Sequence, residues 1–492
     1  MRKKWGFLLI AAMLTVPGIS VRAAELDHGF ENVEQETVLE QEEISLPTDE
    51  EQEENVTEDT EENVGGWVQD GNGWHYVKED GTYYVSEWLR VDGYAYYFDT
   101  EGYRVSGWYS VDSDWYYFDE DGAMQTGWIE VGDNWYFCDE TGIMLTGWQK
   151  IDNNWYYMRK SGRMEIGWLD ENGKWYYLKN NGVMATGWLK IGENWYHMTE
   201  SGRMECGWLE FNGKWYYLGN SGQMEKHWCK IGGCWYYFKD SGEMSQGWEK
   251  ISGDWYYFKD SGKMASGWIW ADGWYYLKQS GIMEKGWLSL NGKWYYLGNS
   301  GKMVTGWNYV SDYKYYFDSN GVMSTDVRGL VSGPYYIKVN RKQNCVTVYA
   351  KDGEKGYTIP VVAFLCSTGG SQTPIGTFTM STQYRWHQLY GAVGQYCSRI
   401  VDHVLFHSVP FTRSGDIYSL MPGQFNRLGT NASSGCVRLA TGDAKWIYDN
   451  CYAGSTKITI YDSSTPGPFG KPTLPKIPYN QNWDPTDPAV SK

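Results

Sequence analysis

Aromatic residues return at a fixed interval through the middle of the chain. From Trp88 to Trp268 a tryptophan stands at every twentieth position, usually directly after a glycine. Each is followed by a short polar stretch, by a second aromatic run such as Trp155-Tyr156-Tyr157, and by a Gly-x-Met segment such as Gly162-Arg163-Met164. A fixed period of this length indicates a repeat architecture. We expect about 13 repeats over residues 65–327.

Each repeat has the pattern of a β-hairpin. Asn-Gly pairs, such as Asn172-Gly173, Asn212-Gly213 and Asn291-Gly292, separate two short aromatic runs, which is the strongest short-range hairpin signal. A single hairpin is marginally stable in water, whereas stacked hairpins bury each other's rings. The pattern therefore predicts a β-solenoid. Strand alternation places the outer two rings of each triplet on one face and the middle ring on the other.

After Asp326 the period ends and a different pattern begins. Alternating and continuous apolar runs predict a mostly β, sandwich-like domain over residues 333–462, with its strands at 335–339, 346–349, 357–363, 404–407 and 458–460. Thr441 can cap a short helix that runs to about Asn450. Five prolines between residues 466 and 478 then mark residues 463–492 as an irregular tail.

The N-terminal region carries an export signal. Basic residues at 2–4, a short apolar run and small residues before Ala24 predict a signal peptide over residues 1–23, cleaved after Ala23 or Ala24. No later stretch has the ~20 apolar residues of a membrane helix, so we expect secretion without membrane insertion. Residues 24–64 are strongly acidic and lack Lys and Arg, which predicts a disordered spacer. The net charge of −18 does not favour nucleic acid as a partner.

Nine cysteines are an odd number for an exported protein, so at least one is expected to be free or paired between molecules. Cys229 and Cys234 flank one hairpin turn and could form a disulfide across it. The alternative is that both remain reduced thiols. The chain has no C-x-x-C spacing typical of a metal site.

The repeated rings have two interpretations. They could serve packing alone, or they could converge on a quaternary ammonium group through cation–π attraction worth about 0.5–2 kcal/mol per ring. The aromatic content of 17% exceeds what a thin solenoid needs for burial, which favours binding notches. Many weak notches in a row would give avidity.

The repeats resemble the choline-binding, or cell-wall-binding, repeats of Gram-positive surface proteins. The resemblance is carried by units such as Gly187 to Tyr196 and covers residues 65–327. It implies choline-bearing teichoic acid or a related wall polymer as partner, and an example notch formed by Trp188, Trp195 and Tyr217. Related repeats bind glucans. The end units depart from the pattern, because Ala95 and Lys314 stand where the triplet tryptophan belongs.

Cys436 and His407 are the candidate chemical groups of the C-terminal domain. Small residues precede Cys436, which leaves backbone amides free for an oxyanion, and His407 ends a predicted strand. A cysteine needs a neighbouring base to react as a thiolate near neutral pH, and histidine is the usual supplier. By spacing alone, a buried cysteine and a strand histidine are more often structural.

The domain also resembles the L,D-transpeptidase catalytic family. The resemblance rests on Phe406 to Pro410, Ala432 to Leu439 and Thr373 to Phe378, the last being a turn if it has no other role. It implies that Cys436 is the nucleophile and His407 the base. The resemblance also implies that the Ser408 backbone orients the imidazole and that the amides of Gly435 and Cys436 form an oxyanion hole. Ser434 is an implied substrate contact. Arg438 is either a substrate contact or a structural residue, and we interpret it as structural.

Two departures from the family pattern stand out. Ser434 occupies the position of a second histidine, and the interval between His407 and Cys436 is long, which predicts a loop near residues 413–424. His403, on the same predicted face as His407, is interpreted as structural. The resemblance implies a wall-attached transpeptidase of a Gram-positive surface that forms 3→3 cross-links between peptidoglycan stem peptides, without cofactor or metal. The alternatives are an L,D-carboxypeptidase and a non-catalytic surface binder.

Overall fold

The computed structural model describes residues 65–490, which form two compact units, 65–105 and 106–490. The signal peptide predicted at 1–23 and the acidic spacer predicted at 24–64 lie outside the described residues. Among the helices of the described part, none is long and apolar enough to cross a membrane.

The first unit consists of two β-hairpins. Strand β1 (Gly66–Gln69) pairs with β2 (Trp74–Val77), and β3 (Trp88–Val91) pairs with β4 (Tyr94–Tyr97). The Trp67 ring lies 4.8 Å from that of Tyr96, measured between centroids, so the first hairpin packs its tryptophan on the second.

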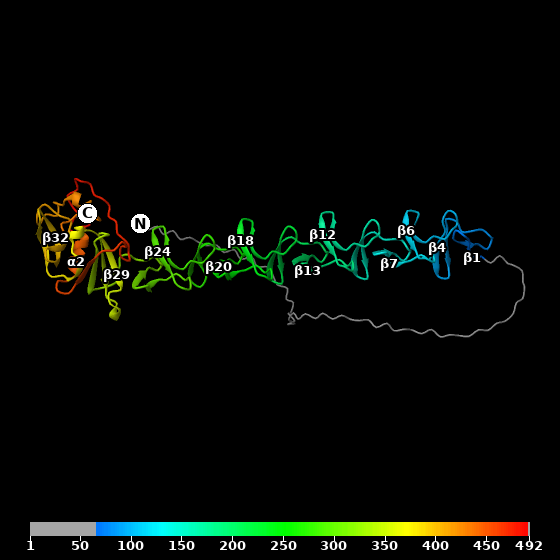
Figure 1. Ribbon diagram of the computed structural model, residues 1–492, viewed down its shortest axis with the longest axis horizontal. Helices are drawn as coiled ribbons and strands as arrows, with labels where there is room; N and C mark the ends of the chain where they lie inside the picture. Colours follow the sequence, from blue (N-terminus) through cyan, green and yellow to red (C-terminus); the bar gives the residue numbers. More distant parts are fainter. Residues whose placement is uncertain (1–64, 491–492) are drawn as a thin grey trace, which may run out of the picture. The chain divides into compact units, whose positions relative to one another are not determined.

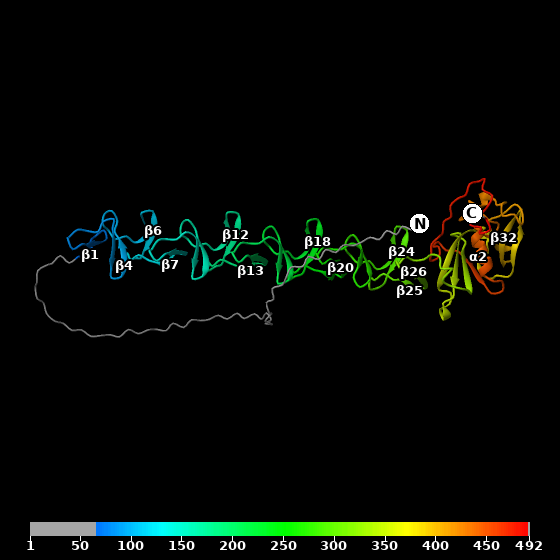
Figure 2. The same ribbon diagram turned by 180° about the vertical axis from the view of Figure 1, so that it is seen from behind.

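The second unit begins with eleven further hairpins, drawn in cyan to green in Figures 1 and 2. Each pairs a strand that begins at or near the Gly-Trp dipeptide with the strand that carries the aromatic triplet. Their strands are β5 (Gly107–Val111), β6 (Asp114–Phe118), β7 (Gly127–Val131), β8 (Asn134–Cys138), β9 (Gly147–Ile151), β10 (Asn154–Met158), β11 (Gly167–Glu171), β12 (Lys174–Leu178), β13 (Gly187–Ile191), β14 (Asn194–Met198), β15 (Gly207–Phe211), β16 (Lys214–Leu218), β17 (His227–Ile231), β18 (Cys234–Phe238), β19 (Gly247–Ile251), β20 (Asp254–Phe258), β21 (Gly267–Trp270), β22 (Trp274–Leu277), β23 (Gly286–Leu290), β24 (Lys293–Leu297), β25 (Gly306–Val310) and β26 (Tyr313–Phe317).

The turn chemistry and the core of these hairpins follow from the sequence. Asn172 and Gly173 both have positive φ, 56° and 73°, as a two-residue hairpin turn requires. The residue directly after each triplet is buried and forms the thin core of the array, as Leu178 does at 0% exposure. The predicted solenoid of 13 hairpins is confirmed.

Successive hairpins of the second unit interlock. The middle tyrosine of a triplet packs on the tryptophan of the preceding hairpin, as Tyr176 does on Trp148 at 4.9 Å, while Trp155 and Tyr157 contact Trp148 within its own hairpin. The predicted alternation of the rings is therefore confirmed. Backbone bonds add to the stacking, because from Met144 to Met323 the amide of each Gly-x-Met methionine donates to the backbone carbonyl of the triplet tryptophan in the hairpin before its own.

The C-terminal part of the second unit is a curled, mixed sheet of nine strands in the order β30-β35-β27-β28-β29-β34-β33-β32-β31. Its halves join where β29 pairs with β34. The strands are β27 (Tyr335–Asn340), β28 (Cys345–Ala350), β29 (Ile359–Ser367), β30 (Gly376–Thr379), β31 (Gln383–Leu389), β32 (Ala392–Val401), β33 (Val404–Ser408), β34 (Val437–Leu439) and β35 (Lys457–Tyr461).

Helix α2 (Thr441–Asn450) packs on this sheet, with Ala444 and Ile447 fully buried in its core. The predicted helix is present, but the predicted cap is wrong. Thr441 is the first helical residue, and its amide donates to the buried carboxylate of Asp484, 2.8 Å away. The other helical segments are α1 (Pro422–Phe425) and two short 3-10 turns, η1 (Gly353–Lys355) and η2 (Gly370–Gln372).

The last hairpin and the C-terminal tail both pack on the sheet domain. The Lys314 amide donates to the Thr358 carbonyl, and the Val327 amide to that of Val361. Residues 463–490 contain no helix or strand, in agreement with the predicted irregular tail, yet Asp484 and Asp487 are buried against the domain. This segment is therefore part of the folded domain.

Candidate active site and aromatic notches

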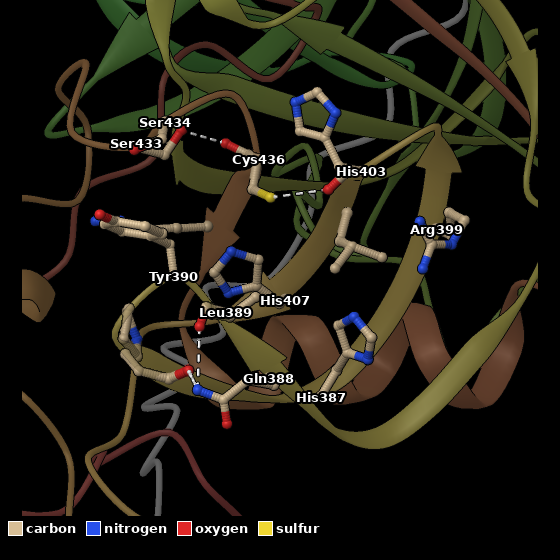
Figure 3. A pocket seen from close by; sticks show the side chains of 14 residues that line it. His387, Gln388, Leu389, Tyr390, Arg399, His403, His407, Ser433, Ser434 and Cys436 are labelled. Carbon is tan, nitrogen blue, oxygen red and sulfur yellow. Dashed lines mark hydrogen bonds between the residues drawn. The ribbon is translucent and has the colours of Figure 1, made fainter.

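Two adjacent parallel strands bring the candidate cysteine and histidine together. The register of β33 with β34 places Phe406 opposite Val437, so Cys436, one residue before β34, lies opposite Leu405. Alternation then directs His407 and Cys436 to the same face. Both line one cavity of about 370 Å³ (Figure 3).

The His407 imidazole is held in one orientation. Its Nδ1 lies 2.6 Å from the Ser408 carbonyl oxygen, which can only accept, so Nδ1 carries the proton and Nε2 keeps a free lone pair. The side chain is buried, at 1% exposure, and this burial lowers its pKa from 6.5 to about 4. The imidazole is therefore neutral near pH 7.

The Cys436 thiol is also neutral at rest. It is half-buried, and burial raises its pKa above the ordinary value of 9.0. Its Sγ lies 3.6 Å from the carbonyl oxygen of His403. Since both partners avoid charge, the geometry suits a general base that takes the thiol proton during attack more than a preformed thiolate–imidazolium pair.

The loop before the cysteine is tightly constrained. Gly435 has φ of +122°, and a Cβ at this position would lie 3.1 Å from the Gln372 carbonyl oxygen, so glycine is required. The Gly435 amide donates to Ser433 Oγ at 3.2 Å, and that hydroxyl donates to the Cys436 carbonyl. The amide expected in the oxyanion hole thus contacts the Ser433 hydroxyl in this structure.

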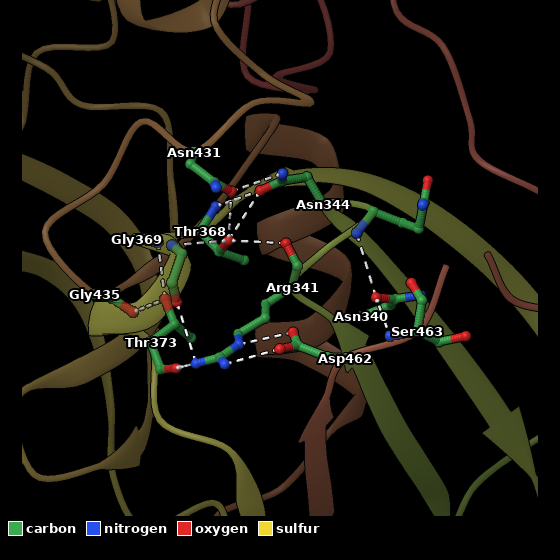
Figure 4. A network of polar contacts seen from close by, with 12 residues as sticks. Asn340, Arg341, Asn344, Thr368, Gly369, Thr373, Asn431, Gly435, Asp462 and Ser463 are labelled. Carbon is green, nitrogen blue, oxygen red and sulfur yellow. Dashed lines mark hydrogen bonds and ion pairs between the residues drawn. The ribbon is translucent and has the colours of Figure 1, made fainter. Parts of the chain in front are cut away.

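A polar network supports this loop from behind (Figure 4). Thr373 Oγ1 donates to the Gly435 carbonyl at 2.8 Å, and Arg341 donates to the Thr373 carbonyl while its guanidinium is paired with Asp462. In the sequence, Thr373 belongs to the element that resembles the transpeptidase family, with a turn as its simplest role, and no motif points to Arg341. The signal for Thr373 was present in its motif, whereas Arg341 lies far from any motif in the sequence.

The wall and rim of the cavity come largely from β31, β32 and the turns that follow them. His387, Tyr390, Arg399 and His403 line it together with the exposed Ser434. No motif in the sequence points to His387, Tyr390 or Arg399. Among the described lining residues none is acidic, so the cavity favours an anionic substrate.

Arg438 contacts the segment that precedes Cys436, and part of that segment has no regular secondary structure. Arg438 donates to Gln424 Oε1 and to the Ala432 carbonyl, which agrees with its structural interpretation, although it also lines the cavity. Residues 413–421 lie outside helices and strands, and α1 follows, where the sequence predicted a loop.

The aromatic notches recur between hairpins. One cavity of about 300 Å³ is lined by Trp168, Trp175, Tyr196 and Met204. The two tryptophans come from one hairpin, and the tyrosine and the methionine come from the hairpin that follows. Trp175 is 43% exposed, so the notch is open to solvent. Such converging rings can hold a cation.

The example notch predicted from the sequence needs one correction. Trp188 lies 6.4 Å from Trp195 and 5.0 Å from Tyr216, between ring centroids. The predicted third ring, Tyr217, instead packs on Trp208 of its own hairpin at 5.1 Å. Alternation points neighbouring tyrosines to opposite faces, so a one-residue error selects the wrong notch.

The possible disulfide between Cys229 and Cys234 is not formed. Both are free thiols, and the register pairs Cys229 with Tyr236 and Cys234 with Ile231. Directly opposite positions, which favour a disulfide, are therefore occupied by other residues. No group of three or more metal-binding side chains occurs in residues 65–490.

Fold and site together define a modular protein, in which an array of aromatic hairpins precedes a domain with a paired thiol and imidazole. Residues 334–460 match the model of the L,D-transpeptidase catalytic domain. Eight stretches between residues 85 and 305 match the choline-binding repeat, and 65–83 and 305–323 match a "Putative cell wall binding repeat". The chain therefore carries an L,D-transpeptidase catalytic domain preceded by choline-binding repeats.

Known proteins match the two parts separately. "Putative L,D-transpeptidase YciB" of Bacillus subtilis is 34% identical over 131 residues, which are 25% of this chain and 64% of that protein. The chain thus spans less than two thirds of this relative. The solved structure of CbpJ from Streptococcus pneumoniae is 29% identical and covers 48% of this chain and 99% of its own, with a TM-score of 0.41. Choline-binding protein F from the same species is 31% identical over 53% of this chain and 98% of its own, with a TM-score of 0.34.

Proposed function

We propose that this protein is a wall-attached L,D-transpeptidase that forms 3→3 cross-links between peptidoglycan stem peptides. One observation carries the proposal. His407, with its free Nε2, and Cys436 line a single cavity within the domain that matches the transpeptidase family. The absence of acidic residues among the described lining residues suits a stem peptide, which carries several carboxylates.

In the first half-reaction, Cys436 Sγ attacks the carbonyl carbon of the third stem residue. Its proton passes to His407 Nε2, the carbon–nitrogen bond to the terminal D-alanine breaks, and the same proton leaves with the amine of that D-alanine. The product is a thioester between the stem and Cys436.

In the second half-reaction, the side-chain amine of another stem attacks the thioester carbonyl. A proton moves from the attacking nitrogen to His407 Nε2 and then to the departing sulfur, so the free enzyme is regenerated. If water attacked instead, the product would be the shortened stem of a carboxypeptidase.

The repeats would hold the enzyme on its substrate. Each notch offers rings that attract a quaternary ammonium group, so choline-bearing teichoic acid, or another wall polymer with similar groups, is the proposed partner. A row of such notches multiplies weak contacts into firm attachment. This attachment supports a location on the surface of a Gram-positive cell wall.

The decisive experiment mixes the protein with a disaccharide-tetrapeptide and follows products by mass spectrometry. Loss of D-alanine with formation of a dimer is expected. Loss without a dimer would assign the carboxypeptidase activity, and no loss would leave a non-catalytic surface binder. Cys436→Ala should abolish the reaction, whereas Cys206→Ala, which removes an exposed thiol of the repeats, should not.

A further inference from the structure

His403 stands at the mouth of the catalytic cavity. It lies in the turn between β32 and β33 and is exposed to solvent, while its side chain lines the same cavity as Cys436 (Figure 3). His407, in contrast, is buried behind the nucleophile. The site thus holds one imidazole that is shielded from water and another that is in contact with it.

Both the backbone carbonyl and the imidazole of His403 lie close to the loop that carries Cys436. Its carbonyl oxygen lies 3.6 Å from Cys436 Sγ, and its Nε2 would lie 3.9 Å from a Cβ placed on Gly435. The ring is therefore beside the backbone at which an acyl group on Cys436 would be bound. Among the described residues, no hydrogen bond or ion pair to the His403 ring is formed, so its nitrogens remain available to a substrate.

The chemistry of cross-linking requires a base in this place. The acceptor is an aliphatic amine, which at neutral pH is almost entirely an ammonium ion because such amines have a pKa of about 10.4. An ammonium has no lone pair with which to attack a thioester. It must first lose a proton, and a base beside the acyl group can take that proton from the amine where it is bound.

His407 is poorly placed to accept this first proton from the ammonium. Its Nδ1 is hydrogen-bonded to the Ser408 carbonyl. Its Nε2 already transfers one proton in each half-reaction, from the thiol to the leaving amine and from the attacking amine to the sulfur. Within the loop, Ser433 and Ser434 titrate at no relevant pH. The other titratable or charged lining groups are His387, Arg399 and Arg438, from β31, β32 and β34.

We propose that His403 is the second acid–base residue of this site, which takes one proton from the incoming ammonium at Nε2 and releases it to solvent. The inference rests on the proposed function. The neutral amine then attacks the thioester, and its second proton follows the route through His407. His403 thereby favours amine over water as the acceptor, because it produces the stronger nucleophile next to the acyl group.

The test compares two acceptors in His403→Gln after acylation of Cys436 by a donor stem. The stem amine needs deprotonation, whereas hydroxylamine is already uncharged at neutral pH. We expect acylation and capture by hydroxylamine to be unchanged and cross-linking to fall roughly 100-fold. The cross-linking rate of the variant should rise about tenfold for each unit of pH, because the fraction of free amine rises by the same factor.

A matched control is His227→Gln, which replaces an exposed imidazole in the repeats and should alter none of the three rates. Equal losses with both acceptors, a loss of acylation, or unchanged cross-linking would each overturn the role of His403. Unchanged acylation also reports that the variant is folded. A wild-type protein that forms no acyl-enzyme at all would instead refute the proposed function itself.

Discussion

At the level of single residues, the site keeps the candidate nucleophile, Cys436, and the candidate base, His407, uncharged in the absence of substrate. Burial lowers the pKa of His407 and raises that of Cys436, and both shifts favour the neutral pair. A neutral thiol is oxidised less readily than a thiolate. The cost is that proton transfer must accompany attack.

The pH dependence of acylation follows from this arrangement. With a pKa of about 4, His407 remains a competent base well below the ordinary histidine value of 6.5. Acylation of Cys436 should therefore lose activity only as the pH approaches about 4, in single-turnover measurements. An acidic limb near 6.5 would contradict a buried base.

The same shift predicts a loss of stability in acid. Between pH 6.5 and about 4 the unfolded chain protonates this histidine and the folded chain does not. The free energy of unfolding should therefore decrease as the pH falls through this range. His407→Gln should weaken the pH dependence of denaturant unfolding over this interval, and an unchanged dependence would argue against the shift.

The hydroxyl of Thr373 should matter for rate. Thr373→Val keeps the shape but removes the donor to the Gly435 carbonyl, which costs about 1–3 kcal/mol at a buried acceptor and loosens the loop of Cys436. We expect slower acylation, measured by mass spectrometry of the acyl-enzyme. Thr377→Val, which removes an exposed hydroxyl of the same sequence element, is the control.

Sequence motifs point to Cys436 and His407 as candidates because the chemistry expected of them depends on few neighbours. They could not identify Arg341, which reaches Thr373 through the fold across about 30 intervening residues. The role proposed for His403, which the sequence leaves as a structural residue, rests on its distance to Gly435, and alternation predicts only a face. Such roles depend on tertiary contacts.

At the level of elements, the Gly-x-Met segments pack successive hairpins closely against each other. Gly162 has φ of +79°, and a Cβ on it would lie 2.1 Å from Met144 Sδ, whereas Gly167 has φ of +80° with open space around it. Gly162→Ala should thus destabilise the array by about 1–3 kcal/mol more than Gly167→Ala, through overpacking. Denaturant unfolding followed by tryptophan fluorescence measures the difference.

The combination with Met144→Ala separates the two causes. If the clash with Met144 is responsible, removal of that side chain should reduce the extra cost of Gly162→Ala, whereas the cost of Gly167→Ala should stay the same. Equal effects of both glycine variants from the outset would contradict the interlocking described above.

The hairpins were predictable because the period, the Asn-Gly turns and the ring alternation agree with one another. The sequence pattern does not predict β31, because Gln383–Leu389 is largely polar and lies at the edge of the sheet, where little apolar alternation is needed. It does not predict β32 either, because Gly, Gln, Ser and Arg interrupt the apolar residues of Ala392–Val401. That edge carries His387 and leads to Tyr390, so the missed strands are also the missed wall of the cavity.

At the level of the second unit, the repeats and the sheet domain share one notch. Trp287, Trp294 and Tyr315 line a cavity like those between interior hairpins, but its further wall is Phe469 of the C-terminal tail. The same tail contacts the loop before the nucleophile, because Lys471 Nζ donates to the Gly429 carbonyl. A ligand in this notch therefore touches a segment that also supports the active-site loop.

This arrangement predicts that choline stabilises the catalytic domain as well as the repeats. A ligand at a hundredfold excess over its dissociation constant contributes about 2.7 kcal/mol to the structure that binds it. Hydrogen exchange of peptides covering residues 429–435 and 466–471 should slow when choline is added. Phe469→Ala removes the tail ring and should abolish the effect there, whereas Trp175→Ala, which disrupts an interior notch, should preserve it. Slowing that persists in Phe469→Ala would show that the last notch does not communicate with the domain through its tail.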